Sequence, residues 1–211
     1  MDHRTVVTAV AAAAILLAAG CTDQKAGGTP SPAPQPSASP SVPATQKPPF
    51  AGAPKVTNPL PSSVLSGSPC EALTPQQVQV NIGVSVAGKP DNLPGIGPQC
   101  TWTNKQTSAQ MGVSFTTEPG DGLSGDYANT RPKMPVWKEL PPIQGLPAVV
   151  YSDNSKPNPD FCAVAIGITD ALSVDVTVAL SLQKSGKVDA CTVVPLTAND
   201  VVTTLKQKAG S

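Results

Sequence analysis

Four cysteines set the framework within which the C-terminal part of this chain has to fold. They are Cys70, Cys100, Cys162 and Cys191, and an even number in an exported chain indicates disulfides. Of the three connectivities that four cysteines allow, we expect Cys70–Cys100 and Cys162–Cys191, because each closes a local loop. Each loop spans about thirty residues, which the chain-entropy model values at about 3.6 kcal/mol. The chain has no Cys-x-x-Cys spacing, so we do not expect a zinc site.

The N-terminus has the organisation of an export signal. A short polar start is followed by an apolar run from Val6 to Ala19. About fourteen helical residues at ~1.5 Å each reach roughly 21 Å, short of the ~30 Å hydrocarbon core, so the run predicts export and not a membrane span. The sequence Leu17-Ala18-Ala19-Gly20-Cys21 resembles the bacterial lipobox. This resemblance implies that residues 1–20 are removed and that Cys21 becomes lipidated.

Lipidation of Cys21 would decide where the protein resides. One fatty chain binds a membrane only marginally, whereas two or three chains of the palmitate type on one residue give stable anchoring. We therefore expect the protein on the extracytoplasmic face of the cell membrane. The small residues Ala18 and Gly20 also suit an ordinary signal peptidase, which is the competing interpretation of this cleavage site.

Residues 21–62 have the composition of a tether. Eleven prolines lie among the 41 residues from Thr22 to Ser62, with Ser, Ala, Thr and Gly between most of them. Such a segment buries too little apolar surface to offset the entropy lost on ordering, so we expect it to be disordered and partly polyproline. Residues 63–211 then form one folded domain of roughly 150 residues.

Capping signals place a helix at each end of this domain. The sequence Thr74-Pro75-Gln76-Gln77 combines a capping box with a proline in the first turn, and predicts a helix from Thr74 to about Ile82 that ends at Gly83. A similar signal at Thr197-Ala198-Asn199-Asp200 predicts the start of a C-terminal helix. Its apolar face would consist of Val201, Val202, Leu205 and Ala209.

Between the two helices the apolar residues alternate with a period of two, which is typical of strands. The predicted strands are Cys100–Asn104, Met111–Phe115, Ala148–Ser152, Cys162–Ile168 and Leu172–Leu182. The last two are separated by only three residues and should form a hairpin. We therefore expect an α+β domain, with an antiparallel sheet of about five or six strands and the N-terminal and C-terminal helices packed on one face.

Short sequences around the cysteines also carry a family resemblance. They are Pro69-Cys70-Glu71-Ala72-Leu73-Thr74, Cys100-Thr101-Trp102, Gly145-Leu146-Pro147-Ala148-Val149, Cys162 at the start of a strand and Cys191 before the last helix. Together they resemble an actinobacterial lipoprotein family catalogued as domain of unknown function 3558. In that family a lipobox and a Pro-rich spacer precede the domain. The resemblance implies an exported, disulfide-bonded α+β domain and supplies no catalytic residues.

Composition argues against several classes of function. The chain has 14 Lys plus Arg and 14 Asp plus Glu, so it lacks the positive field that nucleic-acid binding needs. Lys55, Lys89 and Lys105 are scattered along the sequence and are interpreted as solvated surface. The only histidine is His3, in the predicted signal peptide, so the mature protein would have no imidazole for catalysis or metal binding.

These observations favour a protein that is not an enzyme and that needs no cofactor or metal. Glu118, Asp121 and Asp126 lie among glycines but lack the spacing of an EF-hand. A hydrolase that used carboxylates alone would need a pair of acids in one pocket. We rank that function last and expect to find no such pair.

A long Pro-rich connection contains Tyr127, Met134 and Trp137 and is the candidate binding loop, because aromatic residues in loops on rigid scaffolds often contact partners. The competing interpretation is that this stretch folds down and covers one face of the sheet. The leading hypothesis is a membrane-anchored, non-enzymatic lipoprotein that binds an envelope protein or wall component. The alternative is a carrier of a lipid or other small apolar ligand in a cleft between sheet and helices.

Overall fold

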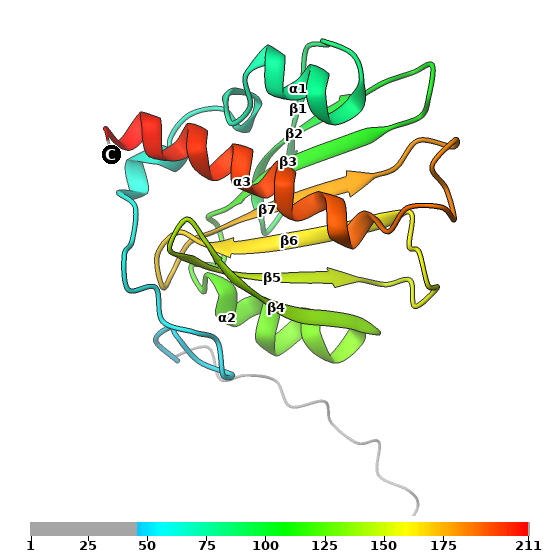
Figure 1. Ribbon diagram of the computed structural model, residues 1–211. Coiled ribbons are helices and arrows are strands. Elements are labelled where there is room, and N and C mark those ends of the chain that lie inside the picture. Colours follow the sequence, from blue (N-terminus) through cyan, green and yellow to red (C-terminus); the bar gives the residue numbers. More distant parts are fainter. Residues whose placement is uncertain (1–45, 211) are drawn as a thin grey trace, which may run out of the picture. The chain divides into compact units, whose positions relative to one another are not determined.

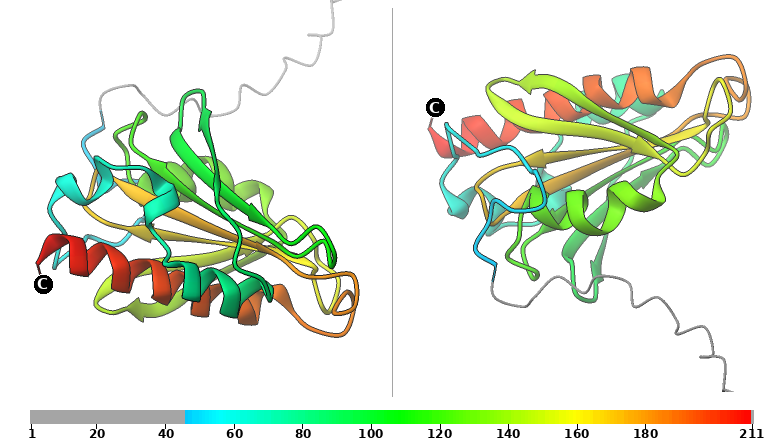
Figure 2. Two further views of the ribbon diagram at one scale, coloured as in Figure 1. Left: turned by 90° about the horizontal axis from the view of Figure 1, so that it is seen from above. Right: turned by 90° about the horizontal axis from the view of Figure 1, so that it is seen from below.

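A computed structural model describes residues 46–210 of the chain. The predicted signal peptide, Cys21 and the larger part of the predicted tether lie outside the described residues. Seven antiparallel strands form one sheet in the order β1-β2-β3-β7-β6-β5-β4. Helices α1 and α3 lie on one face of this sheet, and α2 lies on the other (Figure 1, Figure 2).

The element bounds are as follows. The strands are β1 (Lys89–Leu93), β2 (Gly97–Thr103), β3 (Gln110–Thr116), β4 (Val136–Ile143), β5 (Leu146–Ser152), β6 (Phe161–Gly167) and β7 (Ser173–Ala179). The α-helices are α1 (Pro75–Ile82), α2 (Leu123–Gly125) and α3 (Ala190–Ala209). Short helical turns are η1 (Ser62–Leu65), η2 (Pro69–Glu71), η3 (Asp126–Thr130) and η4 (Arg131–Lys133). No helix among residues 46–210 is long and apolar enough to cross a bilayer.

The α+β class and the antiparallel sheet are confirmed, but the predicted number of five or six strands is wrong. The two strands that the pattern missed, β1 and β4, are the edges of the sheet. Four of the five side chains of β1 are exposed, and both edge strands contain proline, at Pro90 and at Pro141-Pro142. An edge strand exposed to solvent needs no apolar alternation and tolerates proline, so neither strand carries the usual signal.

Helix α1 forms where its capping signal predicts. The backbone N–H of Gln77 donates to Thr74 Oγ1 at 3.2 Å, and the backbone N–H of Thr74 donates to Gln77 Oε1 at 2.8 Å. Gly83 ends the helix with a left-handed backbone (φ 79°), a conformation that glycine adopts without a steric penalty.

Helix α3 begins seven residues before the predicted start at Thr197. Its N-cap is Asp189, whose Oδ1 accepts a hydrogen bond from the backbone N–H of Cys191 at 2.7 Å. Thr197 instead donates through its hydroxyl to Asn81 Oδ1 of α1 at 2.5 Å. Pro195 stands inside the helix and costs one backbone hydrogen bond. Burial of one face of α3 against β6 and β7 offsets that loss. The buried side chains of this face are Val194, Ala198, Val201, Val202 and Leu205.

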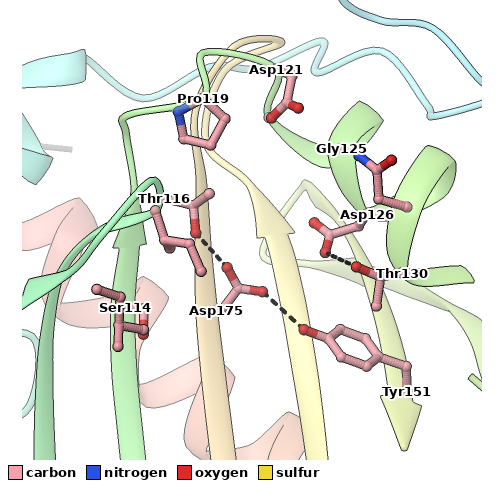
Figure 3. A pocket seen from close by; sticks show the side chains of 13 residues that line it. Ser114, Thr116, Pro119, Asp121, Gly125, Asp126, Thr130, Tyr151 and Asp175 are labelled. Carbon is pink, nitrogen blue, oxygen red and sulfur yellow. Dashed lines mark hydrogen bonds between the residues drawn. The ribbon is translucent and has the colours of Figure 1, made fainter. Parts of the chain in front are cut away.

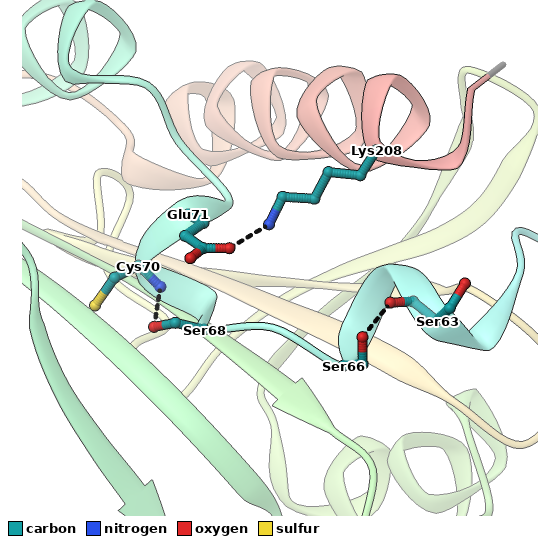
Figure 4. Close-up of polar contacts among 6 residues, drawn as sticks. All are labelled: Ser63, Ser66, Ser68, Cys70, Glu71 and Lys208. Carbon is teal, nitrogen blue, oxygen red and sulfur yellow. Dashed lines mark hydrogen bonds and ion pairs between the residues drawn. The ribbon is translucent and has the colours of Figure 1, made fainter.

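Both disulfides have the expected pairing, Cys70–Cys100 and Cys162–Cys191. The first joins η2 to β2, and the second joins β6 to the first turn of α3. An ion pair joins η2, which contains Cys70, to the other end of α3: Lys208 Nζ in the last turn of α3 lies 3.0 Å from Glu71 Oε2 of η2 (Figure 4). The two ends of α3 are therefore fixed independently to the body of the domain.

The sheet buries side chains on both faces. On the helix side, β3 and β7 contribute Met111, Val113, Phe115, Val174 and Val176 to the main core. On the other side a smaller cluster consists of Leu123, Tyr127, Val149 and Ala165. The second cluster shows that the stretch between β3 and β4 covers part of the sheet.

Residues 46–62, which composition assigned to the tether, pack on the domain. Val56 and Leu60 are buried. The backbone N–H of Val56 donates to Asp170 Oδ1 at 2.8 Å, and that of Leu60 donates to the Ile168 carbonyl at 3.1 Å. The packed part of the chain thus begins before residue 63. Proline-rich backbone loses little entropy on ordering, so two buried side chains and a few hydrogen bonds are sufficient to fix it.

Candidate functional site

A pocket of about 390 Å³ opens on the face of the sheet opposite α3. Its floor is formed by strands β3, β5 and β7, one wall by the α2–η3 stretch, and the other wall by the turn between β1 and β2 (Figure 3). We call it the acidic pocket, and its lining includes Ser114, Thr116, Asp121, Asp126, Thr130, Tyr151 and Asp175. No lysine or arginine lines it.

Strand alternation places Asp175 in the floor of this pocket. Its neighbours Val174 and Val176 point into the main core, so the side chain between them must point to the opposite face. Ser114 stands directly opposite Asp175 in the register of β3 and β7 and therefore shares that face. Because β7 is the central strand of the sheet, the Asp175 carboxylate lies at the centre of the pocket-side face of the sheet.

Two hydroxyl groups hold the Asp175 carboxylate. Thr116 Oγ1 donates to Asp175 Oδ2 at 2.5 Å, and the Tyr151 hydroxyl donates to Asp175 Oδ1 at 3.2 Å (Figure 3). Burial raises the pKa of Asp175, and the two hydrogen bonds oppose that rise. Burial and the nearby carboxylates also raise the pKa of Tyr151, so its phenol remains protonated and acts as a donor.

Asp126 of η3 faces the same pocket from the wall (Figure 3). Burial and the negative charge of Asp175 raise the pKa of Asp126 to about 8, while a hydrogen bond from Thr130 Oγ1 (3.3 Å) lowers it. Burial also raises the pKa of Asp121. Asp121 can lie close to the helical backbone because Gly125 has no Cβ, which would be only 2.6 Å from Asp121 Oδ2. Because the pKa of Asp126 is raised to about 8, its carboxyl holds a proton most of the time at neutral pH.

The expectation that no pair of acids would share a pocket is wrong, because three aspartates line this one. Asp121 and Asp126 belonged to the acid group noted in the sequence, but Glu118 instead accepts a hydrogen bond from the Gly95 backbone at 2.8 Å. Asp175 was not singled out, because it occupies an ordinary polar position in an alternating strand. One feature of the sequence could have identified Asp175: it lies between two valines in the longest predicted strand. A carboxylate at such a position is unusual in a strand that is covered on both faces. Among residues 46–210, no three His, Cys, Asp or Glu side chains are arranged to hold a metal ion.

Of the aromatic residues predicted in the candidate binding loop, Tyr127 packs against the sheet from η3, whereas Trp137 belongs to the edge strand β4 of the sheet itself. Tyr127 is 3% exposed; its ring meets Trp137 edge-on at 5.3 Å, and Trp137 stacks on Tyr151 at 5.8 Å. Met134 is half-buried at the end of η4. The structure therefore brings the buried Tyr127 and the half-buried Trp137 together and connects them to the acidic pocket through Tyr151. This arrangement corresponds to the competing interpretation, in which the stretch covers one sheet face.

Comparison with known proteins adds the family. No curated protein and no solved structure matches the chain. A family model described as "Protein of unknown function (DUF3558)" matches residues 16–204, a range that includes all the described strands and the first three-quarters of α3. The chain therefore belongs to the DUF3558 family of proteins of unknown function.

Proposed function

We propose that the protein is a lipoprotein held in the cell membrane through Cys21, and that its folded domain is a non-enzymatic binding module on the extracytoplasmic face. The apolar run and the lipobox-like sequence before Cys21 support the anchor. Two disulfides support an oxidising location, since such bonds persist mainly outside the cytosol. The segment from Cys21 to residue 45 would connect the anchor to the packed domain.

The observation that carries the binding role is the acidic pocket itself. Four chain segments far apart in sequence build it, and hydrogen bonds from Thr116 and Tyr151 fix its central carboxylate before any ligand arrives. A pocket of this size with a few oriented polar groups is typical of a small-ligand site. The pKa of Asp126 is raised and no basic residue lines the pocket, so no positive charge in the lining stabilises its carboxylates. This favours a ligand group that is cationic and donates hydrogen bonds. The amine of a wall peptide or a lysine of an envelope protein has this chemistry.

Calorimetry of the full chain can test this role with ethylammonium as the probe. An ammonium group that binds Asp126 should displace the proton held there, so binding at pH 7 should release up to about one proton. Titrations in buffers of different ionisation enthalpy measure that number. We expect saturable binding that Asp126→Asn abolishes and that Asp153→Asn, at an exposed position, leaves unchanged. Absence of binding, or binding that Asp126→Asn does not affect, would refute the role of the pocket.

A second function is favoured by the pair Asp126 and Asp175. The function is glycoside hydrolysis by two carboxyl groups. Such a hydrolase needs one carboxyl that stays protonated at neutral pH as the acid and another that acts as base or nucleophile. Asp126, with its pKa raised to about 8, suits the acid, and Asp175 faces the same pocket. Turnover of nitrophenyl glycosides by the wild type that disappears in Asp126→Asn would establish this activity. That result would replace the non-enzymatic proposal.

A further inference from the structure

A groove of about 580 Å³ lies between the segment that follows α1 and the end of β2, away from the acidic pocket. We call it the valine groove. Strand β1 begins at Lys89, opposite Thr101 of β2, while β2 continues to Thr103. The sheet edge is therefore uncovered by β1 at this end, and the segment from Val84 to Gly88 forms the other side. The groove is lined by Val84, Val86, Ala87, Lys89, Thr101, Thr103, Asn104, Lys105 and Gln106.

Both sides of the valine groove are held in place without a ligand. Asn104, which is buried, donates through its side-chain amide to the Ile82 carbonyl at 2.9 Å and accepts from the backbone N–H of Gln106 at 3.0 Å. On the other side Gly88 lies against the Cys100 sulfur and the Trp102 ring so closely that any Cβ would overlap both. The volume is within the range of small-molecule sites, about 300–1,000 Å³.

The charges on this groove come from two lysines that are distant in sequence. Lys89 and Lys105 are both exposed and line the same groove. Within residues 46–210 neither forms an ion pair with a carboxylate, and no acidic residue lines the groove. Asp91, exposed two residues along β1, is the nearest acid in that strand. The structure thus brings together two lysines that the sequence suggested were scattered.

We propose that the valine groove binds a long-chain fatty acid, with its alkyl chain along Val84 and Val86 and its carboxylate between Lys89 and Lys105. The valine side chains and threonine methyl groups offer apolar contact, which favours hydrocarbon. The lysines favour an anion at one end of that hydrocarbon. This site shares no lining residue with the acidic pocket, so each proposal can fail while the other stands.

Photocrosslinking can locate this ligand on the full chain in the presence of nanodiscs of neutral phospholipid. The probe is palmitic acid that carries a diazirine, and its methyl ester serves as the uncharged control. Peptide mapping should find the label on residues 84–89 or 101–106, with at least about fivefold less from the methyl ester, since loss of one charge contact of about 1 kcal/mol changes affinity to that extent.

Two variants and a matched control decide the outcome. Val86→Asp places a negative charge in the groove, and the exposed pair Lys89→Gln/Lys105→Gln removes the positive charges without touching the core. We expect both to lower labelling at least about fivefold, while Lys55→Gln/Lys156→Gln, at exposed positions outside the groove, should not. Circular dichroism confirms that each variant is folded. Labelling outside the groove, or labelling that the lysine variant does not change, would overturn the proposal. It would also be overturned if the lysines affected only binding to anionic phospholipid vesicles, because the site would then contact the membrane surface.

Discussion

Replacement of Asp126 by asparagine should make the domain more stable at neutral and mildly alkaline pH. In the folded chain the pKa of Asp126 rises from 3.8 to about 8, so the folded state binds this proton more tightly than the unfolded state. The proton-linked stabilisation is complete below about pH 4 and is lost progressively as the pH rises towards 8. Asparagine has nearly the same shape, keeps an acceptor for Thr130 and never ionises. The variant therefore avoids the cost of a buried charge.

The magnitude follows from the size of that rise. At about 1.4 kcal/mol per pH unit, a rise from 3.8 to about 8 is equivalent to about 6 kcal/mol for an isolated buried group. The Asp126 carboxyl faces a pocket that opens to solvent, and part of its pKa rise comes from the charge of Asp175. Solvent screening therefore reduces the stability difference below this figure. We expect Asp126→Asn to be about 2 kcal/mol more stable than wild type at pH 8, and the gain to vanish near pH 4.

Urea denaturation with the disulfides intact, repeated from pH 4 to pH 9, measures this difference. The free energy of unfolding should fall with pH more steeply in wild type than in Asp126→Asn. The exposed control Asp153→Asn should retain the wild-type slope. If Asp126→Asn also retains that slope, or is less stable than wild type at pH 8, then the reasoning about Asp126 is wrong.

Three further changes test the framework of the fold by the same denaturation assay. The double variant Cys162→Ala/Cys191→Ala should lose about 3–4 kcal/mol, because that disulfide closes a loop of about thirty residues; a loss under about 1 kcal/mol would contradict the loop-entropy estimate. Thr74→Ala should lose about 1 kcal/mol through the α1 cap, and an unchanged midpoint would show that Gln77 alone suffices. Gly88→Ala should lose more than about 2 kcal/mol, because its Cβ would overlap the neighbouring disulfide sulfur and indole; wild-type stability would show that the strand moves away freely.

The parts of the fold that the sequence predicts are those in which a local signal and the tertiary structure agree. The α1 helix depends on side chains three residues apart in Thr74 and Gln77, and the β6–β7 hairpin depends on two adjacent alternating runs. The disulfides follow the same logic, because each pairs the cysteines that are nearest in sequence. Such features can be predicted without knowledge of distant contacts.

The parts that were missed depend on contacts between distant residues. Strand β1 has no apolar pattern and exists because β2 offers it a partner edge. The first turns of α3 are held by the Cys162–Cys191 bond and by packing on β6, which outweigh the presence of Pro195. The acidic pocket is the clearest example, since Asp126 and Asp175 come from a short helix and a central strand separated by nearly fifty residues. No spacing rule connects two such positions.

The anchoring proposal is tested most directly by the intact mass of the protein extracted from membranes with detergent. We expect an N-terminus at Cys21 that carries diacylglycerol, and we expect Cys21→Ser to remove that mass and to release the protein from the membrane fraction. A chain that retains residues 1–20 in the cytosol, or one that starts at an unmodified residue after export, would contradict the proposal.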